Sequence, residues 1–236
     1  MSDIKIKKLP QECFDIYGQY NNVPYYINKS KNKFLKNINR GKASPKEIDL
    51  FILNKNNNKA LKGKNKYNFL KENKVGIDCS GFVSYILEEL ALKNKDKHIW
   101  EIIHNTTKNP IKIFYSHKIR PISSKMNADI LTNDINSITI KKINDIKPGD
   151  LIRMNGGKHI AIISEVHYNK KNVSKIIYWQ STENIGVCES EIIIQDPNKE
   201  LKDQLWKKIK GSKYDTLSLY KKKINSNGVK RLKLIS

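Results

Sequence analysis

A mixed α+β fold is predicted by the order of two periodic patterns along the 236-residue chain. Apolar residues at helical spacing are clearest within residues 78–92, whereas short apolar runs separated by turn sequences follow residue 147. Helices followed by an antiparallel meander of strands are typical of α+β domains. We expect a helical and loop extension over residues 1–74 and the core domain over residues 75–236.

The first part of the chain predicts several short helices. A weak helical pattern covers residues 13–20 and ends at the turn-like residues 21–24. Residues 28–74 are rich in Lys and Asn, with two groups of apolar residues. We expect two short helices around residues 41–45 and then a polar loop at residues 54–66.

The strongest helix is expected at residues 78–92. Its apolar face consists of the residues at helical spacing, which are Phe82, Val83, Ile86, Leu87, Leu90 and Ala91. Asp78 stands where an N-cap belongs. Residues 93–145 follow as a long irregular connector that contains Pro110 and Pro121.

The last ninety residues predict the sheet. Pro148-Gly149-Asp150 and Asn155-Gly156-Gly157 are turn signals that bracket a short apolar run. Strands are expected at residues 151–154, 159–166, 174–181, 187–195, 217–223 and 229–235, with a short helix at residues 202–210.

The charge of the chain is strongly positive. Lys and Arg number 45 against 23 Asp and Glu, which gives a formal net charge of +22. Nearly all of the basic residues are Lys, whereas nucleic-acid readout favours Arg. A nucleic-acid binder is the weakest alternative, because the aromatic residues fall in predicted strands and cores and are not interleaved with a basic run. Lys, Asn and Ile are abundant together, which indicates a biased codon composition and a solvated lysine surface more than a selected anion-binding face.

Three cysteines do not form a disulfide framework, and no Cys or His spacing typical of structural zinc occurs. The first ten residues lack an apolar core and a small-residue cleavage site, so we expect no signal peptide in them. No apolar run approaches the length of a membrane span.

Cys79 stands at the first turn of the predicted helix, directly after Asp78. Unpaired backbone N–H groups and the helix dipole at that position favour an anion, so we expect a lowered thiol pKa and a nucleophilic thiolate. The small residues Ser80 and Gly81 would let a substrate carbonyl approach the backbone. The alternative is a buried cysteine that acts as a small hydrophobe.

A thiol nucleophile needs a general base, and His159 is the best of five histidines because it opens an apolar strand directly after a Gly-Gly turn. The base needs an acceptor for its Nδ1–H, and the neighbouring strand offers Trp179 or Gln180. An indole N–H only donates, whereas the Gln carbonyl accepts, so Gln180 is the expected partner. Glu183 or Glu189 would replace it if Trp179 faced the base.

Taken together, these motifs resemble the NlpC-type cysteine peptidases of the cell wall. The matching strings are Asp-Cys-Ser-Gly-Phe at residues 78–82, Pro-Gly-Asp at 148–150, His-Ile-Ala-Ile at 159–162 and Pro-Tyr at 24–25. The glycines that usually follow Pro-Tyr are replaced by Asn28 and Lys29, and an insertion of some forty residues precedes Cys79.

The resemblance implies a papain-like fold in which Cys79 is the nucleophile, His159 the base and Gln180 the residue that orients the base. It also implies that Tyr25 borders the cleft, where Asp78 and Ser80 would bind substrate as well. Counting from Gly186 gives Gln180 at the third position, whereas matching the Ser-Thr pair that follows gives Trp179.

The implied activity is hydrolysis of amide bonds in peptidoglycan stem peptides, at the cell envelope or outside the cell, without a metal or organic cofactor. Anionic cell-wall polymer is a further expected partner. Two alternatives remain. One is a different thiol acyl-transfer enzyme, such as an amidase, a deamidase or an acyltransferase. The other is a non-catalytic cationic module that binds the cell wall.

Overall fold

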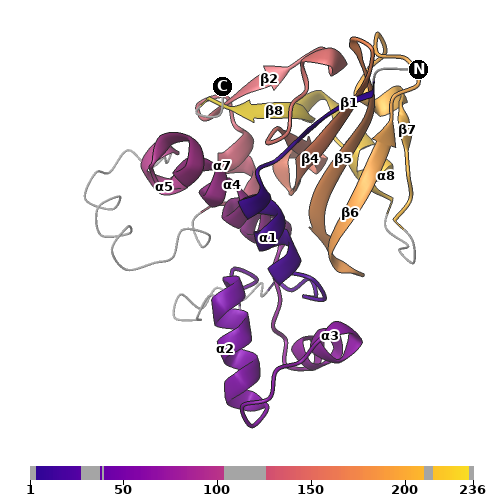
Figure 1. Cartoon of the computed structure of the whole chain (residues 1–236). Helices are drawn as coiled ribbons and strands as arrows, with labels where there is room; N and C mark the ends of the chain where they lie inside the picture. Colours follow the sequence, from indigo (N-terminus) through magenta and orange to yellow (C-terminus); the bar gives the residue numbers. More distant parts are fainter. Residues whose placement is uncertain (1–3, 28–37, 39, 104–125, 210–214, 234–236) are drawn as a thin grey trace.

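The computed structural model describes residues 4–27, 38, 40–103, 126–209 and 215–233, and these residues combine helices with one antiparallel sheet (Figure 1). The described strands are β1 (Ile4–Lys8), β2 (Ser137–Ile140), β3 (Leu151–Met154), β4 (His159–Asn169), β5 (Asn172–Thr182), β6 (Gly186–Ile193), β7 (Leu205–Trp206) and β8 (Gly228–Leu232). The described helices are α1 (Gln11–Gln19), α2 (Pro45–Lys55), α3 (Gly63–Glu72), α4 (Cys79–Lys95), α5 (Ile99–Ile102), α7 (Ala128–Thr132) and α8 (Thr216–Lys221).

In the described ranges, the sheet has eight strands in the order β2-β8-β3-β4-β5-β6-β7, and β1 also pairs with β4. All of these pairings are antiparallel. β4 is long enough to pair with β3 along its first half and with β1 along its second half, while β5 pairs with its other edge. The start of β4 therefore pairs with β3, and the pairing with β5 begins at Ile162.

The two faces of the sheet bury separate hydrophobic clusters. One cluster joins Ile160, Ile162 and Trp179 of the sheet to the apolar residues of α4 and α1. The other joins Ala161, Ile163 and further strand residues to α8 and to the loops beside it. The opposite assignment of neighbouring residues follows from the alternation of side chains along a strand. No helix of the described residues is both long and apolar enough to span a membrane.

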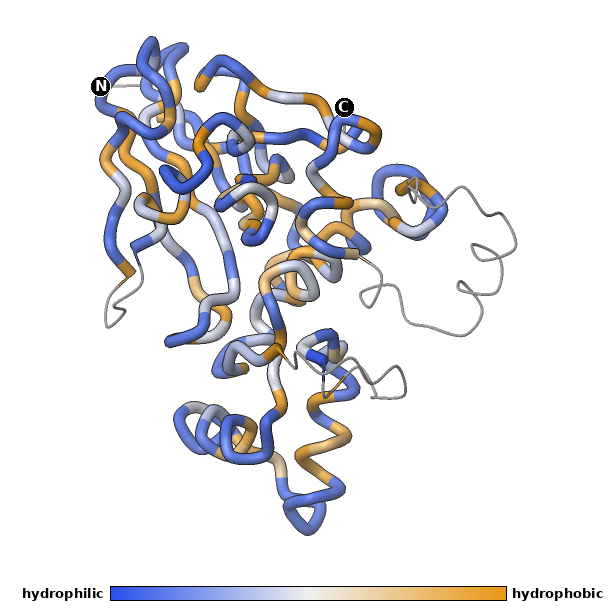
Figure 2. The backbone as a smooth tube through the Cα atoms, turned by 180° about the vertical axis from the view of Figure 1, so that it is seen from behind, coloured by the Kyte–Doolittle hydropathy of each residue, from blue (hydrophilic) through white to orange (hydrophobic). Residues whose placement is uncertain are grey.

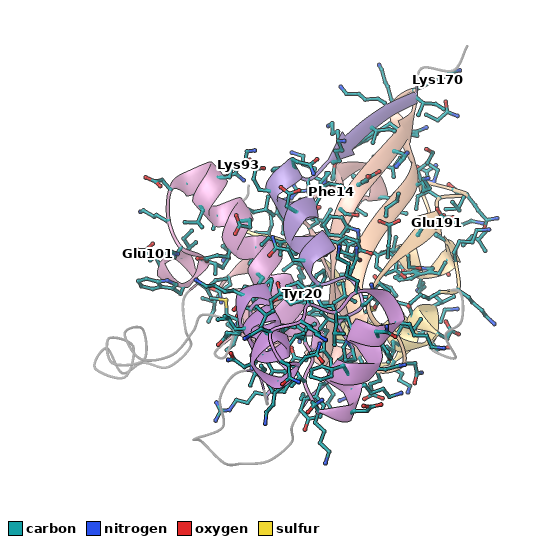
Figure 3. All side chains as sticks on the ribbon, turned by 60° about the horizontal axis from the view of Figure 1, so that its bottom comes forward. Phe14, Tyr20, Lys93, Glu101, Lys170 and Glu191 are labelled. Atoms are coloured by element: carbon teal, nitrogen blue, oxygen red, sulfur yellow. The ribbon has the colours of Figure 1, made fainter. Side chains whose placement is uncertain are left out.

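Helix α1 holds the sheet and α4 together through aromatic side chains. Phe14 and Tyr17 both contact Trp179. The Phe14 and Trp179 rings meet edge to face with their centroids 4.7 Å apart, and the Tyr17 and Trp179 rings stack with their centroids 4.4 Å apart. Tyr20 follows the helix, contacts Phe82 of α4 and donates a hydrogen bond from its hydroxyl to the Ala43 carbonyl at 2.8 Å. Phe14 and Tyr20 are labelled in Figure 3. The aromatic contacts and the buried bond fix the position of the chain that follows.

Residues 23–26 form a strap that passes between two glycines. The Ile77 N–H donates to the Pro24 carbonyl at 3.0 Å, and the Val187 N–H donates to the Val23 carbonyl at 3.3 Å. A Cβ at Gly186 would lie 2.0 Å from the Val23 oxygen, and a Cβ at Gly76 would lie 2.2 Å from the Pro24 oxygen. The close approach of the backbones therefore requires glycine at both positions.

Two C-terminal predictions are wrong. The expected strand at residues 217–223 is the helix α8, because Asp215 caps it by accepting hydrogen bonds from the N–H and hydroxyl of Ser218. The alternating Leu-Ser-Leu-Tyr sequence indicated a strand, but a local cap decides the conformation. The expected helix at residues 202–210 is a 3₁₀ turn at Leu201–Asp203 followed by β7.

The prediction of a polar loop at residues 54–66 is wrong for its last residues, because α3 begins at Gly63. This helix buries Leu70 together with the aliphatic stem of Lys66, a face that hydropathy does not reveal. Figure 2 shows the largely hydrophilic tube of this region, and Figure 1 shows α2 and α3 extending away from the sheet. The sequence did not predict β1 or β2.

Some expectations lie outside the described residues. These are most of the first helix expected before Gly41, the replacements Asn28 and Lys29, and the connector prolines Pro110 and Pro121. The second expected helix near Pro45 is present as α2, which begins with a capping box between Ser44 and Glu47.

The Gly186→Ala substitution should destabilise the protein because it places a Cβ against the Val23 oxygen at a residue whose φ is +84°. We expect a loss of about 1–3 kcal/mol in the free energy of unfolding, measured by urea denaturation. Gly18→Ala is the matched control, since a Cβ added there would meet no atom within 4 Å and α1 should gain about 0.5–1 kcal/mol. Equal stability of both variants would contradict the close approach.

Candidate active site

Cys79 is the first residue of α4, as the sequence predicts, and only 6% of it is exposed. Asp78 caps the helix: its Oδ1 accepts a hydrogen bond from the Gly81 N–H at 2.6 Å. The Asp78 N–H donates to the Gly41 carbonyl at 2.8 Å, which ties the residue before the cysteine to the preceding segment. The start of α4 is therefore fixed from both sides.

His159 is the first residue of β4 and is buried. Its Nε2 lies 2.8 Å from Oε1 of Gln180, a fully buried residue of β5. An amide oxygen only accepts, so this contact requires the ring proton on Nε2 and leaves Nδ1 as the basic nitrogen. The expected pair of residues is brought together, but through Nε2 and not through Nδ1 as the sequence argument supposed.

Trp179 faces the opposite side of the sheet from Gln180. Its ring packs on α1, and its Nε1–H donates to Glu189 at 2.9 Å. Glu189, which the sequence offered as a substitute partner for His159, is thus bound to Trp179. Strand alternation separates the two candidates for the third position, and Gln180 is the one in contact with His159.

Gln180 has a second partner that the sequence did not indicate. Its Nε2 donates to Oγ1 of Thr216 at 3.1 Å, and Thr216 is a buried residue at the first turn of α8. The Gln180 amide is thus bonded at both ends, with its oxygen at His159 and its NH₂ group at Thr216. The region around Thr216 was expected to be a strand, so no sequence signal connected it with the site.

The Cys79 thiol lies against the beginning of β4. Backbone hydrogen bonds from Ile160 and from Ser80 reach the sulfur and lower its pKa. Ile160 directly follows His159 along the chain, so Cys79 lies beside the first residues of β4. The first residues of α4 and β4, which carry the candidate nucleophile and base, therefore lie close together.

The expectation of a lowered thiol pKa at Cys79 is wrong for this structure. Burial, and next the charge of Asp78, raise the pKa to about 12, whereas Lys42 and the two backbone hydrogen bonds only partly oppose the rise. Removal of water from the thiolate outweighs the helix terminus. The thiol is therefore neutral at neutral pH.

His159 is shifted in the direction that also favours its neutral form. Burial lowers the pKa of the imidazole, and the hydrogen bond to Gln180 and the charges of Asp78 and Glu183 oppose that change. The imidazole is therefore favoured in its neutral form, as the Cys79 thiol is.

A cavity of about 400 Å³ opens beside Cys79. The three residues expected to bind substrate, Tyr25, Asp78 and Ser80, all line it. The strap of residues 23–26 brings Tyr25 there. Within the described ranges, no group of three or more His, Cys, Asp or Glu side chains could hold a metal ion.

Further lining residues of the cavity come from the segment that leads into α7 and from the turn before β4. Met126 and Ala128 supply apolar surface, while Asp129 and Lys158 supply charge. Asp129 is held by Arg153 at 2.7 Å. The lining beside the thiol is thus partly apolar and partly charged.

Lys42 is the other residue of the site that sequence reasoning missed. It lines the cavity, its side chain is only 11% exposed, and its Nζ lies 2.7 Å from Asp78 Oδ1. The same Nζ donates to Ser80 Oγ at 2.5 Å and to the Met126 carbonyl at 3.3 Å. In a chain with 45 basic residues, one buried lysine gives no distinguishing signal.

A protein-family model matches the chain. The family described as "Putative amidase domain" matches residues 48–206, roughly two-thirds of the chain. The chain belongs to this amidase-domain family. No curated protein and no solved structure matches.

Membership of the amidase-domain family indicates hydrolysis of amide bonds in general. The family that matches is thus an amidase family, and the match does not single out the NlpC-type peptidases expected from the motifs. The matched residues include Cys79, His159 and Gln180, whereas Lys42 precedes them and Thr216 follows them.

Alkylation should distinguish the three thiols. Iodoacetamide should modify Cys79 before Cys13 and Cys188, because Cys79 alone among them lines the cavity. Since the Cys79 pKa is raised to about 12, the thiolate fraction and the rate should climb through the alkaline range, by up to about tenfold per pH unit. Peptide mass spectrometry of time points measures the order, and faster labelling of Cys13 or Cys188 would contradict it.

Gln180→Ala should lower kcat by about 10²-fold, because the imidazole of His159 loses the acceptor that fixes its tautomer. Trp179→Phe should mainly lower the melting temperature, since it removes the bond to Glu189 on the sheet face opposite to Gln180. Steady-state kinetics and thermal denaturation of both variants separate the two effects. A catalytic loss confined to Trp179→Phe would reverse the assignment.

Proposed function

We propose that this chain is a cysteine amidase in which Cys79 attacks an amide carbonyl, His159 serves as general base and Gln180 orients His159. The observation that carries the proposal is the buried hydrogen bond between His159 and Gln180 at the end of the sheet where Cys79 begins α4. Family membership supports amide hydrolysis independently of these three residues.

The neutral thiol and imidazole favour proton transfer during the attack over a resting ion pair. His159 Nδ1 accepts the thiol proton as the Cys79 sulfur bonds to the carbonyl carbon, and the carbonyl electron pair moves onto oxygen. Backbone N–H groups at the start of α4, including that of Cys79, would stabilise the oxyanion.

Collapse of the tetrahedral intermediate then breaks the C–N bond. The His159 imidazolium gives its proton to the departing amine, and an acyl-thioester remains on Cys79. A water molecule loses a proton to His159 and attacks the thioester; the thiol regains a proton as the carboxylic acid leaves. Gln180 accepts from Nε2–H throughout, and Thr216 holds the Gln180 amide in the orientation that permits it.

The proposed arrangement is papain-like, with a helix that carries the nucleophile packed on an antiparallel sheet that carries the base and its partner. Contacts of α4 with β4 and β5 support this comparison. The NlpC-type motifs support a peptide-like amide substrate, and we propose the stem peptide of peptidoglycan. The surplus of positive charge suits a substrate embedded in anionic wall polymer.

Purified chain should release new amines from isolated peptidoglycan, and Cys79→Ala should reduce the rate by on the order of 10⁴–10⁶-fold, because the covalent route is lost. Release of amines and new muropeptides measures this. Cys13→Ala is the matched control, since it removes a thiol that is fully buried away from the cavity.

Each alternative gives a different result. Equal product from wild type and Cys79→Ala would show a contaminating activity and refute the proposal. Cleavage of simple amides but not of peptidoglycan would refute the proposed substrate and would support the proposed amidase activity. Retention on peptidoglycan without any amine released would favour a binding module.

A further inference from the structure

A buried lysine and a buried carboxylate meet directly beside the nucleophile. Lys42 Nζ and Asp78 Oδ1 are 2.7 Å apart, and both side chains are almost fully buried, at 11% and 6% exposed. Lys42 also donates to Ser80, the residue that follows Cys79. The attraction between two buried charges often only offsets the cost of removing them from water. A gain in stability alone therefore does not explain this pair.

Asp78 supplies part of that reason, because it caps α4. However, an Asn, Ser or Thr side chain caps a helix about as well without a charge. The carboxylate of Asp78 also opposes ionisation of the adjacent thiol, since it raises the Cys79 pKa, and Lys42 lowers that pKa. The cap therefore carries a charge that works against the nucleophile unless a cation accompanies it.

We propose that Lys42 is a positioning residue for the reaction: its ammonium group cancels the charge of the Asp78 cap and so allows Cys79 to pass its proton to His159. The inference rests on the proposed role of Cys79 as nucleophile. The family match begins at residue 48, so it assigns nothing to Lys42.

Other charged groups near the cavity do not substitute for Lys42. Lys158 lines the cavity at the turn before β4 and is exposed to solvent. Asp129 of α7 is paired with Arg153, and Glu183 acts on His159 and is exposed. Solvent weakens the fields of these exposed groups, whereas the Lys42–Asp78 pair is screened far less. Tyr25, which also lines the cavity, is a phenol and uncharged at neutral pH.

The test compares the alkylation rate of Cys79 at one fixed alkaline pH in three variants, with the modified peptide measured by mass spectrometry. Lys42→Met should slow alkylation about tenfold, because Asp78 is left without its counter-charge. Asp78→Asn should speed it about tenfold, because Lys42 then acts alone and Asn still caps α4. The double variant should return to within about threefold of wild type.

Lys66→Met is the matched control. Lys66 is another lysine with an 11% exposed side chain; it forms an ion pair with Asp49 at 3.6 Å, but it does not line the cavity. Its loss should leave the alkylation rate of Cys79 unchanged. If Lys42 had only a structural role, Lys42→Met and Asp78→Asn would both change stability in the same direction. They would not change the alkylation rate of Cys79 in opposite directions.

Equal rates in wild type and Lys42→Met, or changes of the same sign in the two single variants, would overturn the inference. If Lys42→Met does not fold, the Asp78→Asn and double variants still test the inference. An alkylation rate of Cys79 in Asp78→Asn at or below that of wild type would overturn the inference. The readout needs no substrate. Failure of the proposed function, seen as no amide cleavage by wild type, is therefore distinguishable from failure of this inference.

Discussion

The buried carboxylate of Asp78 is the interaction on which the site depends. The carboxylate accepts hydrogen bonds from the Gly81 N–H, from Ser80 Oγ and from Lys42 Nζ. The backbone N–H of Asp78 donates to the Gly41 carbonyl. A carboxylate without water must be satisfied by such donors, so their positions are set together. The beginning of α4, the preceding segment and one wall of the cavity consequently meet at a single side chain.

The remaining parts of the site come from both ends of the chain. Residues before the family match supply Tyr25 and Lys42, and residues after it supply Thr216. The matched part holds the thiol, the imidazole and the amide. The flanking parts determine what surrounds them, so the family match alone describes an incomplete cavity.

Sequence reasoning succeeded where a local pattern determines the structure. The Asp78 cap and the apolar face of α4 located Cys79, and strand alternation together with donor chemistry separated Gln180 from Trp179. It failed at α8, where the local Asp215 cap outweighs the strand pattern. It also failed where contacts distant in sequence decide: α3 buries a lysine stem, and desolvation by the whole fold raises the Cys79 pKa against the local effect of the helix terminus.

The neutral state of the Cys79 thiol has a consequence for durability. Peroxide and disulfides react with thiolates, and low-pKa, accessible cysteines are the ones that are oxidised to sulfenic acid. In the proposed mechanism Cys79 keeps its proton until a substrate carbonyl arrives, so it would escape much of that damage. Burial at the start of α4 thus exchanges some intrinsic reactivity of this thiol for resistance to oxidants.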